Sequence, residues 1–444
     1  MKNNLRASIM PAFEELINSF SKCLESNKPS ELSLWRIETL LMRLLAVFAV
    51  EVMQILIELA HGRGYEGTRI KCPKCAEPMR FERYQQRQIT TLFGEIKFDR
   101  AYYHCRSCRS GYSGVDERLG IGHRSVSPRV HRLVAFLSAH LSFGVVQKAL
   151  KESHELEMNR EVVRQLAEES GEQALCWEKE QESAGENELS ERARTSPKTW
   201  VIECDGKKGG WQDGTCHEVK VGVIYELADR VETSVGRQEL IKRELVARRC
   251  GCQEFARLFW SAMQRAGIRQ GDLIIAVADG AEAMEQIFSF VAPEAVRVRD
   301  FYHVAEKIHA IGELRFGPCS DDGRRWTRVQ LHKLKRSQTK SVIRSIAHLK
   351  LPTAEARETR RQIVNYLNKN CHATDYRRYE RQGWPLGSGA VEGSCRLIGA
   401  RTNGCGRRWR ERGCDAIIAL RVAVLNDRLN LLLPVTDRPH QIAA

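Results

Sequence analysis

Residues 199–206 read TWVIECDG and residues 273–280 read LIIAVADG, so an apolar run ends at an Asp-Gly pair twice in this chain. The runs 200–204 and 273–278 have the length and composition of β-strands. A carboxylate at a strand end points into the crevice where ligands gather in α/β sheets, and a following glycine lets the backbone turn sharply. We therefore predict that Asp205 and Asp279 belong to a functional site. An isolated Asp-Gly pair is more often a turn, which is how we interpret Asp213-Gly214.

The sequence around these runs alternates strands and helices after Pro197. Further strands are expected at 219–225, 241–248 and 295–299, and helices at 255–266 and 282–290. Three strands, a helix, a strand, a helix and a strand is the order of a ribonuclease H-like α/β fold, which we predict for residues 197–303 and 385–434.

The segment between these two parts, residues 304–384, lacks strand character and carries many Lys and Arg residues, which indicates an all-helical insertion. After it, Ser388 is expected to cap a helix through about residue 397, and residues 415–432 are expected to form a closing amphipathic helix.

The part of the chain before residue 178 is predicted to hold two helical units. Residues 1–62 have apolar residues at helical spacing, which we assign to self-packing or dimer contact rather than chemistry. Residues 125–178 should form three helices with Ser127 and Ser142 as N-caps. These fit either a helix-turn-helix-like DNA-binding unit or a plain packing unit, which periodicity does not distinguish. Residues 178–197, rich in Glu, Ser and Ala, have the composition of a solvated linker.

Two C-x2-C pairs flank two β-prone runs, 87–92 and 95–103, that meet at a Phe93-Gly94 turn. The four cysteines are Cys72, Cys75, Cys105 and Cys108. Four thiolates brought together by a hairpin can hold one zinc ion tetrahedrally, and such a site leaves no open position for catalysis. We predict a structural zinc ion in a zinc ribbon over residues 63–115; the alternative is two chance pairs in a chain with 15 cysteines. The basic residues around the pairs fit either DNA contact or a solvated rim.

The composition favours a polyanionic partner in a reducing compartment. Lys and Arg number 70 against 56 Asp and Glu, a formal net charge of +14. No secretory signal is expected at the N-terminus. The most hydrophobic segment, residues 40–60, is interrupted by Arg43, Glu51 and Glu58, so we expect no membrane span. The predicted location is a reducing cytoplasm, with cysteines free or on metal.

Glu392 is the third acidic candidate. It lies in Gly387-Ser388-Gly389-Ala390-Val391-Glu392-Gly393-Ser394, where small neighbours allow close approach to a substrate. Three carboxylates from separate elements can hold two Mg²⁺ or Mn²⁺ ions about 4 Å apart, one activating a hydroxyl and one stabilising the leaving oxygen.

Two features near Glu392 have double interpretations. Trp384 could present its indole to an unstacked base, or it could be a buried packing residue. An arginine cluster after Glu392 fits a phosphate-binding surface better than a solvated face, because it directly follows the proposed metal ligand. The cluster comprises Arg396, Arg401, Arg407, Arg408 and Arg410, with Arg412 beyond it.

Several of these segments resemble successive blocks of a known family. The blocks are Glu203-Cys204-Asp205-Gly206, His217-Glu218-Val219-Lys220-Val221-Gly222, Ala278-Asp279-Gly280-Ala281, Asp300-Phe301-Tyr302-His303 and Gly387-Ser388-Gly389-Ala390-Val391-Glu392. They resemble bacterial insertion-sequence transposases of the acidic-triad (DDE) class, of the ISKra type related to the Mutator-like group. The resemblance implies a catalytic, metal-binding triad of Asp205, Asp279 and Glu392, and a His303 that orients the scissile phosphate.

The sequence therefore predicts a multidomain α+β DNA transposase that cuts the ends of its own element and transfers them to target DNA. Double-stranded DNA is the expected partner, and pairing two ends requires a homodimer or a larger oligomer. One alternative is a catalytically inert DNA-binding repressor derived from a transposase. Another is a structure-selective nuclease of the same fold.

Overall fold

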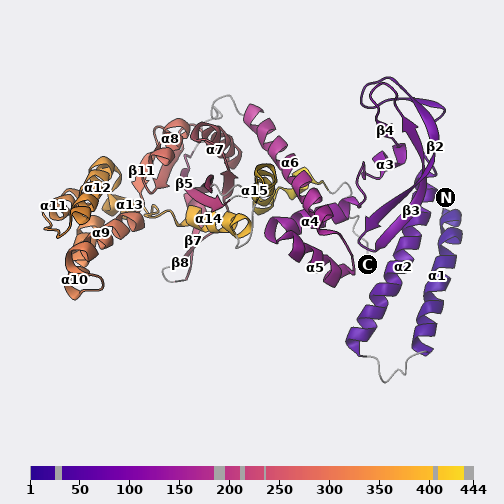
Figure 1. The fold of residues 1–444 in the computed structure, drawn as a ribbon, viewed down its shortest axis with the longest axis horizontal. Coiled ribbons are helices and arrows are strands. Elements are labelled where there is room, and N and C mark those ends of the chain that lie inside the picture. Colours follow the sequence, from indigo (N-terminus) through magenta and orange to yellow (C-terminus); the bar gives the residue numbers. More distant parts are fainter. Residues whose placement is uncertain are drawn as a thin grey trace. The chain divides into compact units, whose positions relative to one another are not determined.

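The computed structural model describes residues 2–25, 33–184, 196–210, 216–234, 237–403 and 409–434 of the 444-residue chain. It is a mixed α and β protein that divides into two compact units, Met1–Leu166 and Ala167–Ala444 (Figure 1). The predicted multidomain α+β class is confirmed as a mixed α and β chain with two compact units. The finer division of the chain into six segments stays a prediction.

The first unit begins with two long helices, α1 (Lys2–Glu25) and α2 (Leu34–His61), as the helical spacing predicted. They pack against each other, with the rings of Phe13 and Phe48 6.2 Å apart. By length and composition alone α2 is apolar enough to cross a membrane, although Arg43, Glu51 and Glu58 lie within it. Core helices of soluble proteins can be as long and as apolar, so this composition does not by itself make α2 a membrane span.

The C-terminal half of α2 nevertheless packs on a sheet of the same unit. The sheet has the antiparallel order β1-β2-β3-β4, formed by β1 (Arg69–Lys71), β2 (Pro78–Thr91), β3 (Gly94–His104) and β4 (Gly111–Tyr112). Ile57 of α2 joins Ile89, Ile96 and Phe98 in one buried cluster. Thr91 pairs with Gly94 across the predicted turn, and both strands extend beyond the predicted runs.

Three helices complete the first unit after the short helix α3 (Gly114–Arg118). They are α4 (Pro128–His140), α5 (Phe143–His154) and the start of α6 (Arg160–Ala184), and they share a core that includes Val130, Val146 and Leu150. Ser127 caps α4 by accepting a hydrogen bond from Val130 N, as predicted. Ser142 precedes α5 but its side chain makes no capping hydrogen bond.

The expectation of a linker from residue 178 is wrong for residues 178–184, because α6 continues to Ala184. Glu178 is buried there and pairs with Arg248 of the sheet described next. This contact with a distant strand is tertiary, which composition alone does not reveal. Residues 185–195 lie outside the described part of the chain.

The second unit is built on a five-stranded sheet with the order β11-β10-β5-β6-β9. The strands are β5 (Thr199–Gly210), β6 (Cys216–Glu226), β9 (Glu244–Arg248), β10 (Leu273–Ala278) and β11 (Val296–Arg299). Strand β6 is antiparallel to both of its neighbours, whereas β10 is parallel to β5 and to β11. All five predicted strands are therefore present. A hairpin of β7 (Arg230–Ser234) and β8 (Arg237–Leu240) was not predicted, because its polar residues form no apolar run.

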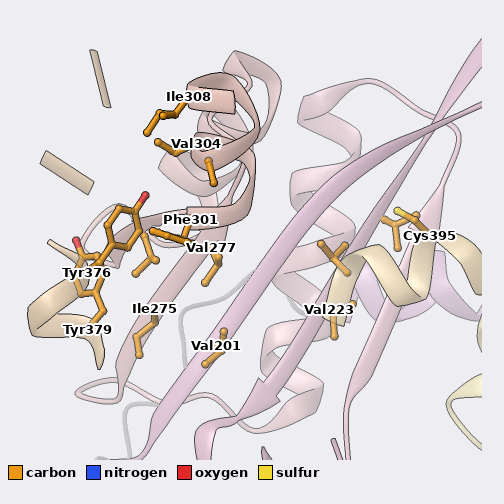
Figure 2. Close-up of a cluster of buried hydrophobic side chains, with 14 of the residues drawn as sticks. Val201, Val223, Ile275, Val277, Phe301, Val304, Ile308, Tyr376, Tyr379 and Cys395 are labelled. Carbon is orange, nitrogen blue, oxygen red and sulfur yellow. The ribbon is translucent and has the colours of Figure 1, made fainter. Parts of the chain in front are cut away.

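Alternate residues of β5 face opposite layers of helices. Ile202 packs with helices α7 (Cys252–Ala266) and α8 (Glu282–Val291) on one face. Val201 packs on the other face with Val223, Val277 and the helices that follow residue 300 (Figure 2). Since side chains alternate along a strand, Glu203 and Asp205 belong to the same face as Val201.

The predicted insertion is all-helical over the residues described. It comprises α9 (Phe301–Phe316), α10 (Asp321–Lys335), α11 (Thr339–Ala347), α12 (Ala354–Asn370) and α13 (Tyr376–Arg381). Three of its tyrosine hydroxyls donate to backbone carbonyls at the strand ends. Tyr366 donates to Asp279, Tyr376 to Arg299 and Tyr379 to Arg297. These bonds fix the insertion to the edge of the sheet where Asp279 lies.

The chain returns to the sheet through α14 (Gly389–Thr402) and α15 (Glu411–Leu425) and ends its described part after α16 (Leu429–Leu432). The single closing helix expected over 415–432 is therefore two helices. Asn426 lies at the break, where its side-chain amide pairs with both the N–H and the carbonyl of Leu245 in β9. Asp427 then adopts a left-handed conformation, which a continuous helix does not allow.

Candidate functional site

The four paired cysteines of the first unit converge on one point. All four sulfur atoms lie within 4.8 Å of one another. The Cys72–Cys108 and Cys75–Cys105 sulfur distances are both 3.6 Å. A tetrahedron with zinc–sulfur bonds of about 2.3 Å has edges of about 3.8 Å, so the four thiols fit one zinc ion.

The backbone around the two pairs is built alike. Ala76 and Arg109, each directly after the second cysteine of a pair, have left-handed φ angles of 62° and 57°. The N–H of Cys72 donates to Glu77 O and that of Cys105 donates to Ser110 O. The Ser110 hydroxyl lies beside two of the sulfurs and lowers the pKa of Cys72 to about 6 and that of Cys108 as well, whereas burial and the neighbouring thiols raise the pKa of Cys75 to about 12. Lower pKa values favour the thiolates that bind metal.

The aspartates of the two Asp-Gly pairs come from neighbouring parallel strands: Asp205 lies in β5, and Asp279 directly follows β10. The last registered pair of these strands is Val277 with Glu203, two residues before both aspartates. Asp205 accepts hydrogen bonds from its neighbour Gly206 N at 2.7 Å and from the Cys395 thiol at 3.5 Å. Asp279 accepts from Ala281 N at 2.8 Å across Gly280, whose φ of 91° favours glycine.

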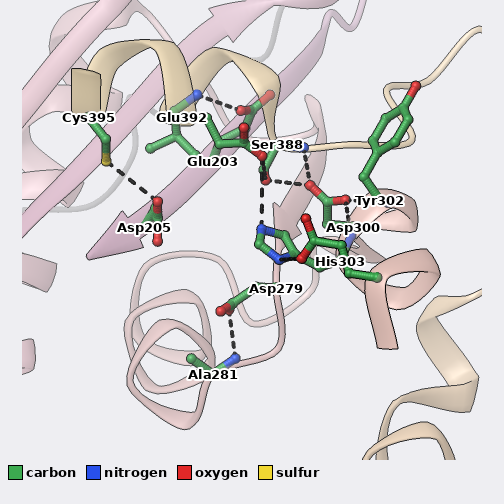
Figure 3. Close-up of polar contacts among 12 residues, drawn as sticks. Glu203, Asp205, Asp279, Ala281, Asp300, Tyr302, His303, Ser388, Glu392 and Cys395 are labelled. Atoms are coloured by element: carbon green, nitrogen blue, oxygen red, sulfur yellow. Dashed lines mark hydrogen bonds and ion pairs between the residues drawn. The ribbon is translucent and has the colours of Figure 1, made fainter. Parts of the chain in front are cut away.

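Glu392 projects from the first turn of α14 on the same face of the sheet. Figure 3 shows it together with Asp205, Asp279 and His303, which come from β5, the end of β10 and α9. Its carboxylate lies 3.9 Å from His303 Nε2 and 3.9 Å from a guanidinium nitrogen of Arg396. The Ser388 hydroxyl is 3.5 Å from the same carboxylate.

Asp300 joins the two helices that carry His303 and Glu392. It is fully buried, and one carboxylate oxygen accepts from the backbone N–H groups of Tyr302 and His303 at the start of α9. The other oxygen accepts from the N–H and the hydroxyl of Ser388. The expectation that Ser388 caps its own helix is therefore wrong, because its side chain is engaged by Asp300 instead. The helix that follows also runs further than predicted, to Thr402.

Glu203 is a member of this face whose role the sequence did not reveal. It is buried in β5 and accepts hydrogen bonds from Val391 N at 2.9 Å and from the Tyr225 hydroxyl at 2.8 Å. Burial raises its pKa to about 7. Because Val391 precedes Glu392, this contact fixes the start of α14 against the sheet. The sequence feature that could have revealed Glu203 is a glutamate inside an otherwise apolar run, two residues before Asp205.

A second group of metal-compatible side chains lies at this face. The ligand atoms of Asp300, His303 and Glu392 all lie within 4.8 Å of one another, whereas Asp205 and Asp279 are not part of that group. The structure thus brings the three predicted acids to one face without closing them around a single point. Carboxylates repel one another, and hard divalent cations are the partners that draw such oxygens together.

The predicted DNA-binding residues differ in their surroundings. Trp384 is buried and stacks on Tyr379 with ring centroids 5.8 Å apart, so it is a packing residue here rather than an exposed platform for bases. Arg401 is also buried, with its guanidinium over the Trp409 ring, which removes it from a phosphate-binding surface. Arg396 and Arg410 are exposed. Arg407 and Arg408 lie outside the described residues, as does Asp213.

Comparison with known proteins assigns the chain to a family. The model of a family described as "Uncharacterised protein family (UPF0236)" matches residues 32–430. A protein of Streptococcus gallolyticus named "UPF0236 protein in vanSb 3'region" is 26% identical over 361 residues, which are 78% of this chain and 74% of that protein. The match begins just before α2 and ends after α16 starts, and it includes both groups of candidate ligands. This chain belongs to the UPF0236 family.

Proposed function

We propose that this protein is a DNA transposase of the acidic-triad class, a metal-dependent nuclease and strand transferase. The observation that carries the proposal is that Asp205 of β5, Asp279 directly after the neighbouring parallel strand β10, and Glu392 of α14 lie on the same face of the sheet (Figure 3). The sheet order, with the first strand between the second and the fourth, supports a ribonuclease H-like catalytic domain interrupted by the helical insertion.

Asp205, Asp279 and Glu392 would hold two Mg²⁺ or Mn²⁺ ions, which activate first water and then the freed 3′-hydroxyl and stabilise the leaving oxygen. Among the chain's own groups, Asp300 and Glu203 act as positioning residues. Asp300 fixes the starts of α9 and α14, and Glu203 holds the backbone beside Glu392. His303 is partly exposed beside Glu392, where its imidazole can donate a hydrogen bond to the scissile phosphate.

The cysteine site belongs to the proposal as a structural zinc site in a zinc ribbon. The ribbon and the helices α4 to α6 would recognise the ends of the element, in double-stranded DNA. The charge of the helical insertion fits DNA as the partner. Residues 304–384 contain 18 Lys and Arg against 8 Asp and Glu, so they supply most of the net charge of +14. The bacterial cytoplasm, with access to the nucleoid, is the location that this chemistry requires.

The test is metal-dependent cutting of a DNA that carries the native ends of the element. Asp205→Asn, Asp279→Asn and Glu392→Gln remove the charge that a hard cation needs and should each abolish cleavage and strand transfer while leaving end binding intact. Asp321→Asn is the matched control, because this exposed acid of α10 lies in the insertion. Variants that cut as well as the parent would refute the assignment.

The same assay separates the two alternatives. A parent protein that binds the ends but never cuts them with Mg²⁺ or Mn²⁺ would be a repressor derived from a transposase. A parent that cuts branched junctions regardless of the end sequence would be a structure-selective nuclease.

A further inference from the structure

Helix α2 packs on the sheet with one face and meets α1 with another. One face packs on the sheet through Val50, Met53 and Ile57. Arg43 on the same side forms hydrogen bonds of 2.9 to 3.1 Å with Glu155, and Gln54 accepts from Lys97 N. The second face meets α1 at Phe48.

This second face is an apolar stripe that α1 covers only in part, since Phe48 lies on it seven residues after Leu41 and three after Leu45. It runs along the helix at spacings of seven, four, seven, four and three residues, which keep side chains on one side of a helix. Its members are Leu34, Leu41, Leu45, Val52, Leu56 and Leu59, with Trp35 and Met42 at its margin. Five of the six are leucines that are 39 to 71% exposed, and Trp35 is 78% exposed.

Helix α1 adds a second exposed stripe. Met10, Phe13 and Ile17 follow one another at helical spacing and are 37 to 48% exposed, and Phe13 also contacts Phe48 of α2. Leu5, five residues before Met10, is 38% exposed. A two-helix hairpin in which both helices leave apolar side chains exposed beside their mutual contact resembles half of a four-helix bundle.

The size of this surface matches an interface between two copies of the chain. At the roughly 60 to 120 Å² that one fully exposed large apolar side chain contributes, these twelve side chains of α1 and α2, most of them about half exposed, amount to on the order of 500 Å² of apolar surface per copy. A stable protein–protein interface buries about 800 Å² per partner, of which about two thirds is apolar in homodimers. A surface of this extent is large for an isolated monomer, in which exposed apolar patches rarely exceed a few hundred Å².

A membrane is a poorer occupant for the same surface. Inserting α2 would break its hydrogen bonds to Glu155 and Lys97 and expose Ile57 of the sheet core. The other helix of the hairpin carries Arg6, Glu14, Glu15 and Lys22, which are costly in a bilayer.

We infer that the α1–α2 hairpin is a dimerisation element, in which the stripes of two copies pack into a four-helix bundle. The occupant of the stripe is thus a second copy of this chain. The inference stands independently of the DNA chemistry proposed above, since it follows from α1 and α2 alone.

Sedimentation velocity of the full-length, zinc-loaded chain across micromolar concentrations tests this. We expect a dimer for the parent and a monomer for Leu41→Glu combined with Leu45→Glu, with the dimer dissociation constant raised at least about 100-fold. Arg36→Glu is the matched control, because it changes the net charge by the same amount on the opposite side of the helix and should stay dimeric. Leu45→Ser alone is the milder variant, expected to weaken the dimer without adding charge.

Folding of each variant is checked by zinc content and helical circular dichroism, both of which should equal those of the parent. A folded parent that remains monomeric, or a folded double variant that remains dimeric, overturns the inference. A third measurement asks whether the parent binds membranes, by flotation with phosphatidylglycerol vesicles. A monomeric parent that floats with the vesicles would assign the stripe to a membrane surface and also overturn the inference. A parent protein that is dimeric but does not cut DNA would count against the proposed function only.

Discussion

The cysteine site and the carboxylate face differ in how completely the fold assembles them. The four thiols converge at distances that fit one zinc ion, with matching backbone bonds at each pair. The acids Asp205, Asp279 and Glu392 reach one face of the sheet, yet Asp205 bonds to Cys395 and Asp279 to Ala281. Each cysteine pair is fixed by a local turn, whereas the three acids come from segments 74 and 113 residues apart and carry like charges. The thiol site is thus largely formed by local backbone geometry, and the carboxylate face is one that cations would have to complete.

The largest effect should come from removing ligands of the cysteine site, whose four thiols already converge. Cys72→Ser or Cys105→Ser should lose the zinc ion and loosen residues 69–112, since a structural zinc site contributes on the order of 10 kcal/mol to folding. Elemental analysis should find one zinc per parent chain and none in these variants, and amide exchange over this sheet should accelerate. Cys371→Ser, at an exposed thiol elsewhere, should change neither quantity. A parent with reduced thiols and no zinc would contradict the prediction.

A smaller effect should appear at the support of the carboxylate face. Burial raises the pKa of Glu203 from 4.5 to about 7, so the folded chain holds this proton more tightly than the unfolded chain does. The stability from this group is present in full below pH 4.5 and is lost as the pH rises through 7. Glu203→Gln does not titrate, so the variant should gain about 3 kcal/mol relative to the parent between about pH 4 and pH 8.

Urea unfolding of the metal-free proteins at acidic and at mildly alkaline pH measures this difference. Glu282→Gln, at an exposed position of α8, is the control and should follow the parent at both pH values. A Glu203→Gln variant that loses stability with pH as the parent does would show that Glu203 is not the titrating group.

The smallest effect concerns a single phosphate contact beside Glu392. Arg396 is 81% exposed, and Arg396→Ala should lower the slope of log affinity for DNA against log salt by about one without changing sequence preference. Arg257→Ala removes the same charge from α7 on the opposite face of the sheet and should leave the slope unchanged. Equal slopes for parent and Arg396→Ala would assign Arg396 to the solvated surface.

The two regions also differ in how far the sequence predicted them. Apolar runs and C-x2-C spacing are local signals, and they located the five strands of the second unit and all four cysteines. The sequence could not reveal that Ser388 bonds to Asp300 rather than to its own helix, because those residues meet only after the insertion has folded. Residue type left Trp384 with two interpretations and placed Arg401 on a DNA surface, and burial, a tertiary property, makes both packing residues. Asn426 breaks the last helix for the same kind of reason, a contact with a distant strand.

The most direct test of the carboxylate face is the binding of Mn²⁺ itself, followed by electron paramagnetic resonance of the free ion in titrations of the zinc-loaded chain. Our account predicts that Asp205→Asn, Asp279→Asn and Glu392→Gln each weaken Mn²⁺ binding at least about tenfold, because all three oxygens are ligands. The alternative geometry is the group of Asp300, His303 and Glu392, whose ligand atoms already lie within 4.8 Å. Mn²⁺ binding that survives Asp205→Asn and Asp279→Asn but is lost in His303→Gln would place the ion in that group and contradict the acidic triad.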